Sequence, residues 1–434
     1  MVKRSLLAET LVENDKWLRS RGVVMDDLVV DTLPDPTVKI QGKKVVSFSS
    51  NNYLGLSRRK EVMTAALAGL KKYGPGTCES RRLGGDLIVL ERLEETIAEY
   101  KGTEDSIIFA TGMMANMGAI PAITDSDFYI NKFFSQAKKP TEVIILGDQL
   151  NHRSIQIGIK LSRAVPLRYK HNDMTHLEEL LDEHKDKPIL IVTDGVFSMD
   201  GDIAPLGKIV ALAKHYRAGI YVDDAHGTGV HGRTGRGSAE HFGVEDEIDF
   251  KMGTLSKAFG GLGGFVAAER GVIDMLKSSA STYYFTSSLP AEQAAGLIAA
   301  INIAKKEPDL RKNLWRNVSY MAQGLKDLGL EFPLQWSQII PVIIGEESKT
   351  LLVEKYLLDN GVQCSGVTPP AVAPGRSRLR ISINATHKKA HIDKLLECLE
   401  SATKKFKLPK IYKTEEEWKR FKEATPDYIN EFLA

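Results

Sequence analysis

Short apolar runs alternate with longer segments of helical periodicity along the middle of the chain, from Val46 to Leu289. Most of the apolar runs are rich in β-branched residues and bounded by glycine, aspartate or lysine, which is typical of buried strands. They cover residues 106–111, 142–148, 164–169, 189–195, 218–224, 250–254 and 263–269. Helical patterns lie between them, for example at 87–101 and 206–216. This alternation predicts an α/β fold in which helices cover both faces of a mostly parallel sheet.

The pattern changes after Leu289. A helical stretch from Pro290 to about Leu328 leads into strand-like runs at 338–345 and 377–384 and further helices, which is typical of an α+β unit. The predicted organisation is therefore an N-terminal arm, a large α/β domain and a smaller α+β domain with a helical tail. Their predicted ranges are 1–58, 59–289 and 290–434, with an inserted loop at 127–141.

Composition and charge exclude several classes of protein. The 434 residues are 43% hydrophobic and 26% charged, which is ordinary for a chain with a large buried core. Basic residues exceed acidic ones by 58 − 56 = 2, so no net charge indicates a nucleic-acid partner. The three cysteines, Cys78, Cys364 and Cys398, are too few and too scattered for a disulfide framework or a zinc site, and we expect no metal.

The amino-terminal segment and the lengths of the apolar runs predict where in the cell the protein lies. The segment from Met1 to Trp17 carries charges throughout and lacks the apolar stretch of a secretory signal. No uncharged apolar run reaches the roughly 18 residues that a membrane-spanning helix needs. Because the cysteines are expected to be reduced thiols, we expect a cytoplasmic protein without an integral membrane segment.

Polar side chains gather where the predicted strands end. In chain order they are Thr111, Gly112, Met113, Asp148, Asn151, His152, Ser198, Asp223, Asp224, His226, Thr254, Ser256 and Lys257. Each residue alone has an ordinary explanation as a helix cap, a turn or a surface group. In open α/β sheets, however, ligands bind beyond the carboxyl ends of the parallel strands. Five strand ends that supply hydroxyls, imidazoles, carboxylates and a lysine together predict an active site there.

The placement of glycines supports the same region. The chain has 36 glycines, and Gly253, Gly260, Gly261, Gly263 and Gly264 surround the predicted site lysine. Such density permits close approach of the backbone to a ligand or to a partner subunit. The pattern is not a dinucleotide-binding fingerprint, because these glycines come late in the chain rather than at a first strand–helix turn.

Several segments together resemble a known family. The stretch from Asp223 to His226, followed by Thr254 to Lys257, is similar to fold-type I enzymes that use pyridoxal 5′-phosphate (PLP). The segments that narrow the resemblance are SSNNYLGLS (49–57), DQLNHRSI (148–155), DGVFSMDGDIAPL (194–206), GTGVHGRTGRG (227–237), YYFTSSLP (283–290) and SRLRISINATH (377–387). They resemble the α-oxoamine synthases, which include glycine C-acetyltransferase, 8-amino-7-oxononanoate synthase and serine palmitoyltransferase. The resemblance extends from about Phe48 to Leu399.

The resemblance implies a role for each catalytic candidate. Lys257 would hold PLP as a Schiff base and then act as the general base at the substrate's α-carbon, which suits an amine of lowered pKa. Asp223 would pair with the pyridinium nitrogen, because the ring withdraws electrons strongly only when that nitrogen is protonated. His226 would hydrogen-bond the phenolic oxygen of the ring, with Ser198 nearby, and His152 would stack on the ring face.

The phosphate group and the subunit arrangement follow from the same resemblance. The residues that would begin a phosphate-binding helix or add a hydroxyl group to the phosphate are Thr111, Gly112, Met113 and Thr254. Free N–H groups at a helix N-terminus are suited to binding an anion. Thr286 and Ser287 match a family segment that reaches the phosphate from the other subunit. The resemblance therefore implies a homodimer with its active site at the subunit interface.

Two arginines are candidates for binding the amino acid's carboxylate. Arg380 matches the arginine that performs this bidentate task in the family, and Asn51 would assist it. Arg378 lies two positions away and would share a face of a strand with Arg380. Only the motif match favours Arg380.

The implied reaction condenses an amino acid with an acyl-CoA thioester. Lys257 would remove the α-proton, the α-carbon would attack the thioester, and CoA would leave. Loss of CO2, which occurs in most members, would then give an α-amino ketone. The amino acid (glycine, alanine or serine) and the acyl chain stay open, since GTLSKAFGG (253–261) resembles glycine C-acetyltransferase and FTSSLP (285–290) resembles serine palmitoyltransferase.

Two other functions are compatible with the same fold. A PLP-dependent aminotransferase would also use Lys257 and Asp223, but nothing in the sequence predicts the switch to a second substrate. A non-catalytic partner subunit would lack the Schiff-base lysine, which is present here. The chain also departs from the family at two positions. Leu90 occupies the place of a histidine, which predicts a substrate-entry wall that is either more apolar or shaped for a different acyl group. Arg153 replaces a small residue, and there it would either meet an anion or face solvent.

Overall fold

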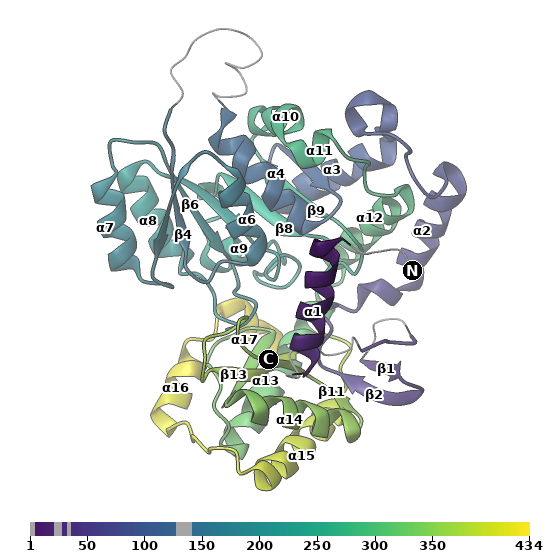
Figure 1. Cartoon of the computed structure of the whole chain (residues 1–434), viewed down its shortest axis with the longest axis vertical. Helices are drawn as coiled ribbons and strands as arrows, with labels where there is room; N and C mark the ends of the chain where they lie inside the picture. The colour runs from purple at the N-terminus through teal and green to yellow at the C-terminus, as the bar shows by residue number, and fades with distance from the viewer. Residues whose placement is uncertain (1–4, 21–27, 33–35, 127–140) are drawn as a thin grey trace.

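The computed structural model describes residues 5–20, 28–32, 36–126 and 141–434. These residues form a larger part that contains the main sheet and a smaller part below it (Figure 1). Apart from Thr141, the predicted insert at 127–141 lies outside the described residues.

The main sheet has seven strands, and each coincides with one of the predicted apolar runs. The strands are β3 (Asp105–Phe109), β4 (Ile144–Asp148), β5 (Val165–Tyr169), β6 (Ile189–Asp194), β7 (Gly219–Asp223), β8 (Phe250–Thr254) and β9 (Gly264–Ala268). Their order is β3-β9-β8-β7-β6-β4-β5, and β9 runs antiparallel to both of its neighbours while the others are parallel. The predicted α/β fold with a mostly parallel sheet is confirmed. Strands β6, β7 and β8 are neighbours, so their carboxyl ends meet at one edge.

Helices cover both faces of this sheet. Alternate residues of β4 point to opposite sides, since Ile144 and Leu146 join the apolar cluster of α7 and α8 whereas Ile145 joins that of α4 and α10. The helices of this part are α2 (Lys60–Tyr73), α3 (Ile88–Lys101), α4 (Gly112–Thr124), α6 (Arg153–Leu161), α7 (Met174–Glu183), α8 (Leu206–Tyr216), α9 (Ser238–Phe242), α10 (Arg270–Ser279) and α11 (Ser281–Tyr284), with short turns η1 (Leu56–Arg58), η2 (Arg81–Gly85) and η3 (Glu245–Glu247). The helices predicted at 87–101 and 206–216 are α3 and α8.

The chain after Leu289 begins with the predicted helical stretch, which divides near Pro308 into α12 (Ala291–Lys306) and α13 (Asp309–Leu328). Helix α12 packs against α2 and α3 of the larger part, so a domain boundary at residues 289–290 stays a prediction. The two predicted strands are β10 (Ile339–Gly345) and β13 (Ser377–Ser382), which pair antiparallel. The remaining elements of this part are β11 (Val362–Gln363), β12 (Ser365–Val367), α14 (Glu347–Asp359), α15 (Lys389–Phe406), α16 (Glu415–Glu423) and α17 (Asp427–Leu433).

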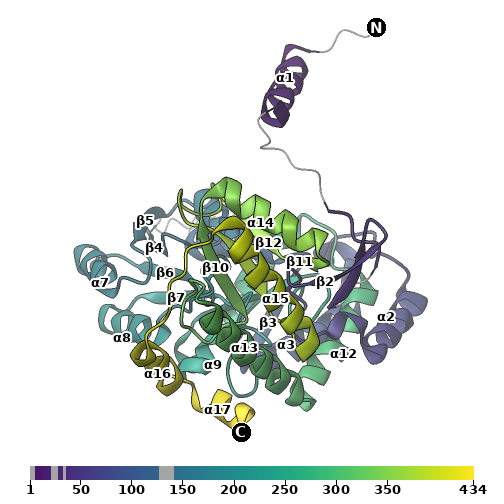
Figure 2. The same ribbon diagram turned by 90° about the horizontal axis from the view of Figure 1, so that it is seen from below.

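The N-terminal segment contains a hairpin that the sequence did not predict. Strands β1 (Thr37–Ile40) and β2 (Lys43–Ser47) pair antiparallel around a turn at Gln41 and Gly42, both of which have positive φ. Strand β2 also pairs in parallel with β11, more than three hundred residues further along the chain. The predicted helical arm is confirmed as α1 (Leu6–Ser20), which has no buried residue and stands apart from the rest of the chain in Figure 2.

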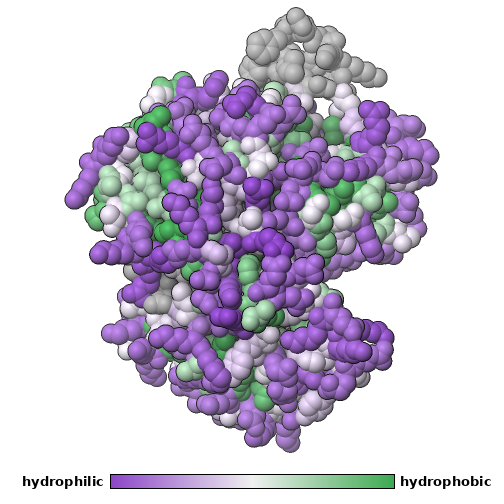
Figure 3. Space-filling view, turned by 180° about the vertical axis from the view of Figure 1, so that it is seen from behind, coloured by the Kyte–Doolittle hydropathy of each residue, from purple (hydrophilic) through white to green (hydrophobic). Residues whose placement is uncertain are grey.

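The outer surface is mostly hydrophilic on the face shown in Figure 3, with apolar patches of limited extent. Within the described ranges, no helix is both long enough and apolar enough to cross a membrane. The same residues contain no group of three or more His, Cys, Asp or Glu side chains that could hold a metal ion.

Candidate active site

A cavity of about 220 Å³ lies at the carboxyl ends of β6, β7 and β8. Its walls are Thr111, Gly112, Met113, His152, Ser154, Asp194, Asp223, Ala225, His226, Met252, Thr254, Ser256 and Lys257. The sheet order explains this set, because neighbouring parallel strands end at the same edge. The four residues predicted to be catalytic, Lys257, His152, Asp223 and His226, are therefore brought together.

Lys257 and His226 are in direct contact in the cavity. The Lys257 Nζ lies 2.8 Å from His226 Nε2. Burial lowers the pKa of Lys257 to about 8, and the Arg380 charge adds to this effect while the Asp223 carboxylate opposes it. Burial and the Lys257 charge also hold the pKa of His226 well below its usual value. A neutral imidazole thus accompanies an amine that loses its proton more readily than an exposed lysine does.

Two buried carboxylates lie at adjacent strand ends. Asp223 is 2% exposed, and its oxygens accept hydrogen bonds from the Asn116 side-chain amide at 2.7 Å and from the Ala225 N–H at 3.1 Å, both neutral donors. Burial and the Asp223 charge raise the pKa of Asp194 well above its ordinary value. Removing carboxylates from water without a cationic partner is costly, so the cavity favours a bound cationic group.

His152 contributes a ring to the wall of the cavity. It caps α6, and its Nδ1 lies 2.7 Å from the Ser154 hydroxyl oxygen. Its backbone N–H donates to Asp194 Oδ2 at 2.6 Å, which ties this turn to the end of β6. Burial of the ring lowers the pKa of His152, although the Asp223 charge opposes the shift. The Asn116 amide, which donates to both Ser154 and Asp223, links the two sides of the cavity.

The N-terminus of α4 forms the opposite wall. Thr111 caps the helix by accepting a hydrogen bond from the Met114 N–H at 3.1 Å. The N–H groups of Gly112 and Met113 belong to the first turn, which has no partners inside the helix and is suited to an anion. The Thr254 hydroxyl lies against Gly112, where an added Cβ would come within 3.3 Å of it. These four predicted phosphate-binding residues thus lie together.

Arg380 and its partners lie next to this cavity rather than in its wall. The Arg380 guanidinium donates to the Ser198 carbonyl at 2.6 Å, the Ser382 hydroxyl at 2.9 Å and Asn51 Oδ1 at 3.2 Å. The Tyr53 hydroxyl bridges the two regions, since it donates to Asn51 Oδ1 at 3.0 Å and lies 2.7 Å from His226 Nδ1. An unbroken line of hydrogen bonds therefore runs from Lys257 to Arg380.

The second arginine has a different environment. Arg378 forms an ion pair with Asp200 at 2.6 Å and also donates to the carbonyl groups of Met199 and Arg376. Its charge is thus already compensated, whereas Arg380 donates to the neutral residues Ser198, Ser382 and Asn51. This contrast supports Arg380 as the carboxylate-binding candidate.

Three of the predicted cofactor-binding residues lie outside the cavity wall. Ser198 approaches Arg380 instead, with its hydroxyl oxygen 3.3 Å from Nη2. Thr286 and Ser287 also do not line the cavity, and the Ser287 backbone forms an isolated β-bridge with Ser80. The neighbouring Phe285 is 81% exposed, so this segment points outward from the subunit.

The structure adds residues that sequence reasoning missed and corrects one interpretation. The added residues are Tyr53, Asn116, Ser154 and Asp194. Asp194 gave a signal, because it ends a predicted strand, but Asn116 lies inside an apolar helix and gave none. The predicted apolar substrate wall at Leu90 is wrong, since Leu90 is completely buried in the apolar core of α3. Arg153 is exposed and donates to Gln156 one turn along α6.

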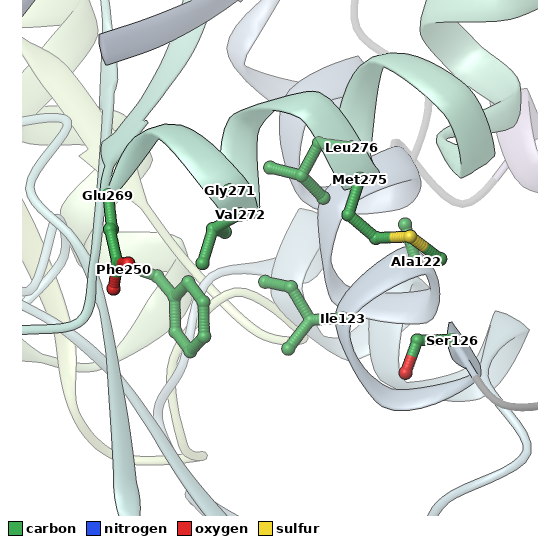
Figure 4. A pocket seen from close by; sticks show the side chains of 9 residues that line it. All are labelled: Ala122, Ile123, Ser126, Phe250, Glu269, Gly271, Val272, Met275 and Leu276. Atoms are coloured by element: carbon green, nitrogen blue, oxygen red, sulfur yellow. The ribbon is translucent and has the colours of Figure 1, made fainter. Parts of the chain in front are cut away.

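A larger cavity, of about 320 Å³, lies elsewhere and is mostly apolar. It is formed between α4 and α10, and the side chains that point into it include Ile123, Phe250, Val272, Met275 and Leu276 (Figure 4). Its polar side chains are Ser126 and Glu269. Among the described residues that line it there is no lysine, so it does not offer the Schiff-base amine of the predicted chemistry.

The residues of the smaller cavity fit PLP. The buried Asp223 carboxylate matches a pyridinium cation, the first turn of α4 matches a phosphate, and the Lys257 amine lines the same cavity. A Cβ at Gly264 would lie 2.5 Å from the Gly112 Cα, so the backbone of β9 lies directly against this turn. The donor set therefore suits a flat ring that carries a positive nitrogen and a phosphate.

Comparisons with known proteins agree with this fit. The class I and II aminotransferase family matches residues 43–399. The serine palmitoyltransferase of Bacteriovorax stolpii is 39% identical over 92% of each chain, and the 8-amino-7-oxononanoate synthase of Thermoanaerobacter pseudethanolicus is 40% identical over 90% of this chain and 96% of its own.

Solved structures show the same relationship. The serine palmitoyltransferase of S. paucimobilis, solved with a bound PLP–myriocin aldimine, has a TM-score of 0.84 and 32% identity over 93% of this chain and 100% of its own. The Sphingomonas wittichii serine palmitoyltransferase has a TM-score of 0.84 and 33% identity over 94% of this chain and 100% of its own. The chain therefore belongs to the α-oxoamine synthase family and is a PLP-dependent enzyme.

Proposed function

We propose that this enzyme condenses glycine, alanine or serine with an acyl-CoA thioester, usually with loss of CO2, to give an α-amino ketone. The observation that carries the proposal is the line of hydrogen bonds through Lys257, His226, Tyr53, Asn51 and Arg380. It supports the proposal because it connects the candidate general base, Lys257, to the candidate carboxylate-binding guanidinium, Arg380, within one site. Both groups are required to hold an amino acid and to remove its α-proton.

The residues that would hold PLP are Lys257, Asp223, His226, His152, Ser198, Thr111, Gly112, Met113, Thr254, Thr286 and Ser287. When bound, PLP supplies an electron sink that stabilises negative charge at the amino acid's α-carbon. Asp223 would keep the ring nitrogen protonated in its buried position, and the first turn of α4 would bind the phosphate.

The chain's own residues then orient the amino acid and move its proton. Arg380 has five N–H groups, and its weakest contact is the 3.3 Å bond to the Ser198 hydroxyl. A substrate carboxylate can take the Nη2 donors with little loss. Lys257, whose pKa is lowered to about 8, accepts the proton from the α-carbon, and His226 lies within hydrogen-bond distance of its Nζ.

The experiment is a thiol-release assay with purified enzyme that contains PLP. Glycine, alanine and serine are each combined with short-chain and long-chain acyl-CoA, and free thiol is measured. Thiol release with at least one pair, abolished in Lys257→Ala, supports the proposal. Transfer of an amino group to a keto acid without thiol release would instead indicate an aminotransferase.

We also propose that the enzyme is a homodimer in which Thr286 and Ser287 complete the partner's site. Their segment does not line the cavity of its own subunit, and the nearby Leu83 and Phe285 are 73% and 81% exposed. Exposed apolar side chains of this size favour a protein partner. A cytoplasmic location is part of the same proposal, supported by the three free cysteines.

Hybrid dimers test the shared site. Lys257→Ala subunits are mixed with Thr286→Ala/Ser287→Ala subunits after mild dissociation. If the sites are shared, one site of each hybrid is intact and thiol release recovers. If Thr286 and Ser287 serve their own subunit, each hybrid has one site that lacks Lys257 and one site that lacks Thr286 and Ser287. Neither site is intact, so thiol release does not exceed that of the separate variants.

A further inference from the structure

The loop at residues 195–204 holds both arginines of β13 in place. The Ser198 carbonyl accepts a hydrogen bond from Arg380 Nε at 2.6 Å, and the Met199 carbonyl accepts one from Arg378 at 3.0 Å. The Asp200 carboxylate completes the contacts with Arg378. The orientation of the Arg380 guanidinium therefore depends on where this loop lies.

The base of the loop is fixed by backbone hydrogen bonds. The Gly195 N–H donates to the Asp223 carbonyl at 2.8 Å, and the Ala204 N–H donates to the Gly195 carbonyl at 3.0 Å. Near the tip, Gly201 packs so closely on β10 that a Cβ there would lie 2.3 Å from the Ile339 carbonyl oxygen. These contacts do not connect the tip to the sheet that carries Lys257.

His171 makes that connection. Its Nε2 lies 2.5 Å from Asp202 Oδ2 in the loop, and its Nδ1 lies 3.0 Å from Asp148 Oδ1 at the end of β4. The ring also meets Phe197 of the loop edge-on, with the ring centres 4.5 Å apart. The neighbouring Asn172 donates a second hydrogen bond to Asp202 at 2.8 Å.

The charges at this contact favour a firm attachment. Asp148 is 3% exposed, so its carboxylate is fixed in the sheet rather than free in solvent. Burial alone would lower the pKa of His171, but the hydrogen bonds to Asp148 and Asp202 outweigh it and raise the pKa to about 10. A protonated imidazole between two carboxylates makes charge-assisted hydrogen bonds on both sides, and these are stronger than neutral ones.

We propose that His171 is a positioning residue for the amino-acid substrate: by joining Asp202 to Asp148, it fixes the 195–204 loop so that Ser198 orients Arg380. His171 lies outside the cavity wall, so it acts through the loop and not on the reacting atoms. The inference rests on the proposed role of Arg380 in binding the substrate carboxylate.

The experiment compares His171→Gln and Asp202→Asn with the wild-type holoenzyme, and His215→Gln, at an exposed position of α8, is the matched control. The amino-acid Kd is measured from the change in PLP absorbance on titration with glycine, alanine and serine, without acyl-CoA. We expect a rise on the order of tenfold in both variants, below the roughly 100-fold that a 1 Å misplacement can cost. The PLP Kd should change less than about twofold, because the residues proposed to hold PLP, apart from Ser198, lie outside the 195–204 loop.

An amino-acid Kd that rises less than about threefold in folded variants overturns the inference. So does an equal rise in the Kd of PLP, which would indicate a general structural defect. If His171→Gln does not fold, the amino-acid Kd of the isosteric Asp202→Asn variant tests the inference alone. The Arg380→Lys variant separates the role of Arg380 from that of His171. If the amino-acid Kd of Arg380→Lys equals that of the wild type, the proposed role of Arg380 itself is refuted. If that Kd rises while the amino-acid Kd of the His171 and Asp202 variants stays at the wild-type value, only the positioning role of His171 is refuted.

Discussion

Replacing Gly264 by alanine should weaken PLP binding, because β9 leaves no room for a side chain beside the first turn of α4. A Cβ at this position would lie 2.5 Å from the Gly112 Cα, 2.6 Å from the Thr111 carbonyl oxygen and 2.7 Å from the Gly112 nitrogen. All three are backbone atoms, so no side chain can rotate away. The turn that they form is the proposed phosphate site.

The size of the effect follows from these distances. Ordinary contact begins at 3.4 Å, so the turn must move by about 0.9 Å relative to β9. Overpacking of this kind typically costs about 1–3 kcal/mol of stability. A tenfold change in affinity corresponds to about 1.4 kcal/mol, and we expect the PLP Kd of Gly264→Ala to rise by roughly ten- to a hundredfold.

The assay is a spectrophotometric titration of the apoenzyme with PLP, combined with thermal unfolding of the apoenzyme. Gly207→Ala is the matched control, since an added Cβ at that position of α8 meets nothing within 4 Å. Its PLP Kd should equal that of the wild type. A Gly264→Ala variant that binds PLP as tightly as Gly207→Ala would refute the reasoning about close backbone approach.

Three further predictions concern other parts of the molecule. Asp223→Asn should leave the protein folded but reduce thiol release on the order of 10²–10³-fold, as loss of a preorganised electrostatic contact does; activity within tenfold of the wild type would contradict its role. The pKa of His171 is raised to about 10 by Asp148 and Asp202, against the effect of burial. The contribution of the protonated His171 to the stability of the fold is therefore complete below about pH 6.5 and is lost as the pH rises through 10. The difference in Tm between the wild type and His171→Gln should shrink over that interval, and a constant difference would argue against the charged imidazole. Ile429→Ala, in the fully buried face of α17, should lower the free energy of unfolding by about 2–5 kcal/mol in urea titrations, whereas no change would show that the tail is dispensable.

The main sheet was predictable because most of its strands are buried on both faces. Every residue of β6 is buried, as is every residue of β9, and such strands read as continuous apolar runs in the sequence. Strands β1, β2 and β11 gave no comparable signal. Two of the five residues of β2 are exposed lysines, and its partner β11 has only two residues, at Val362 and Gln363. Pairing over such a distance in sequence leaves no local pattern.

The active site was predictable to the extent that it follows strand ends. Asp223 and Thr254 each end a strand of the main sheet, and His226 and Lys257 follow within three residues. The rule failed for Ser198, because the 195–204 loop folds back through a hydrogen bond from the Phe197 N–H to the Asp202 carbonyl. That reversal carries Ser198 away from the cavity to Arg380. No periodicity in the sequence encodes such a turn.

The two halves of the site come from different parts of the fold, and Tyr53 joins them. The segment before α2 is tied to β13 by hydrogen bonds from the Ser382 N–H to the Phe48 carbonyl and from the Ala385 N–H to the Tyr53 carbonyl, both at 2.7 Å. Its Tyr53 hydroxyl reaches His226 in the larger part.

The same junction couples substrate binding to the strength of the base. The positive charge of Arg380 contributes to the lowered pKa values of Lys257 and His226, after the larger effect of burial. A carboxylate bound to Arg380 compensates that charge, so the pKa of the free Lys257 amine rises when the amino acid is in place. Because a stronger base removes the α-proton more readily, binding of the substrate's carboxylate to Arg380 would favour proton removal by Lys257. In its proposed role Arg380 would thus serve the reaction in two ways, by orienting the amino acid and by adjusting the base that acts on it.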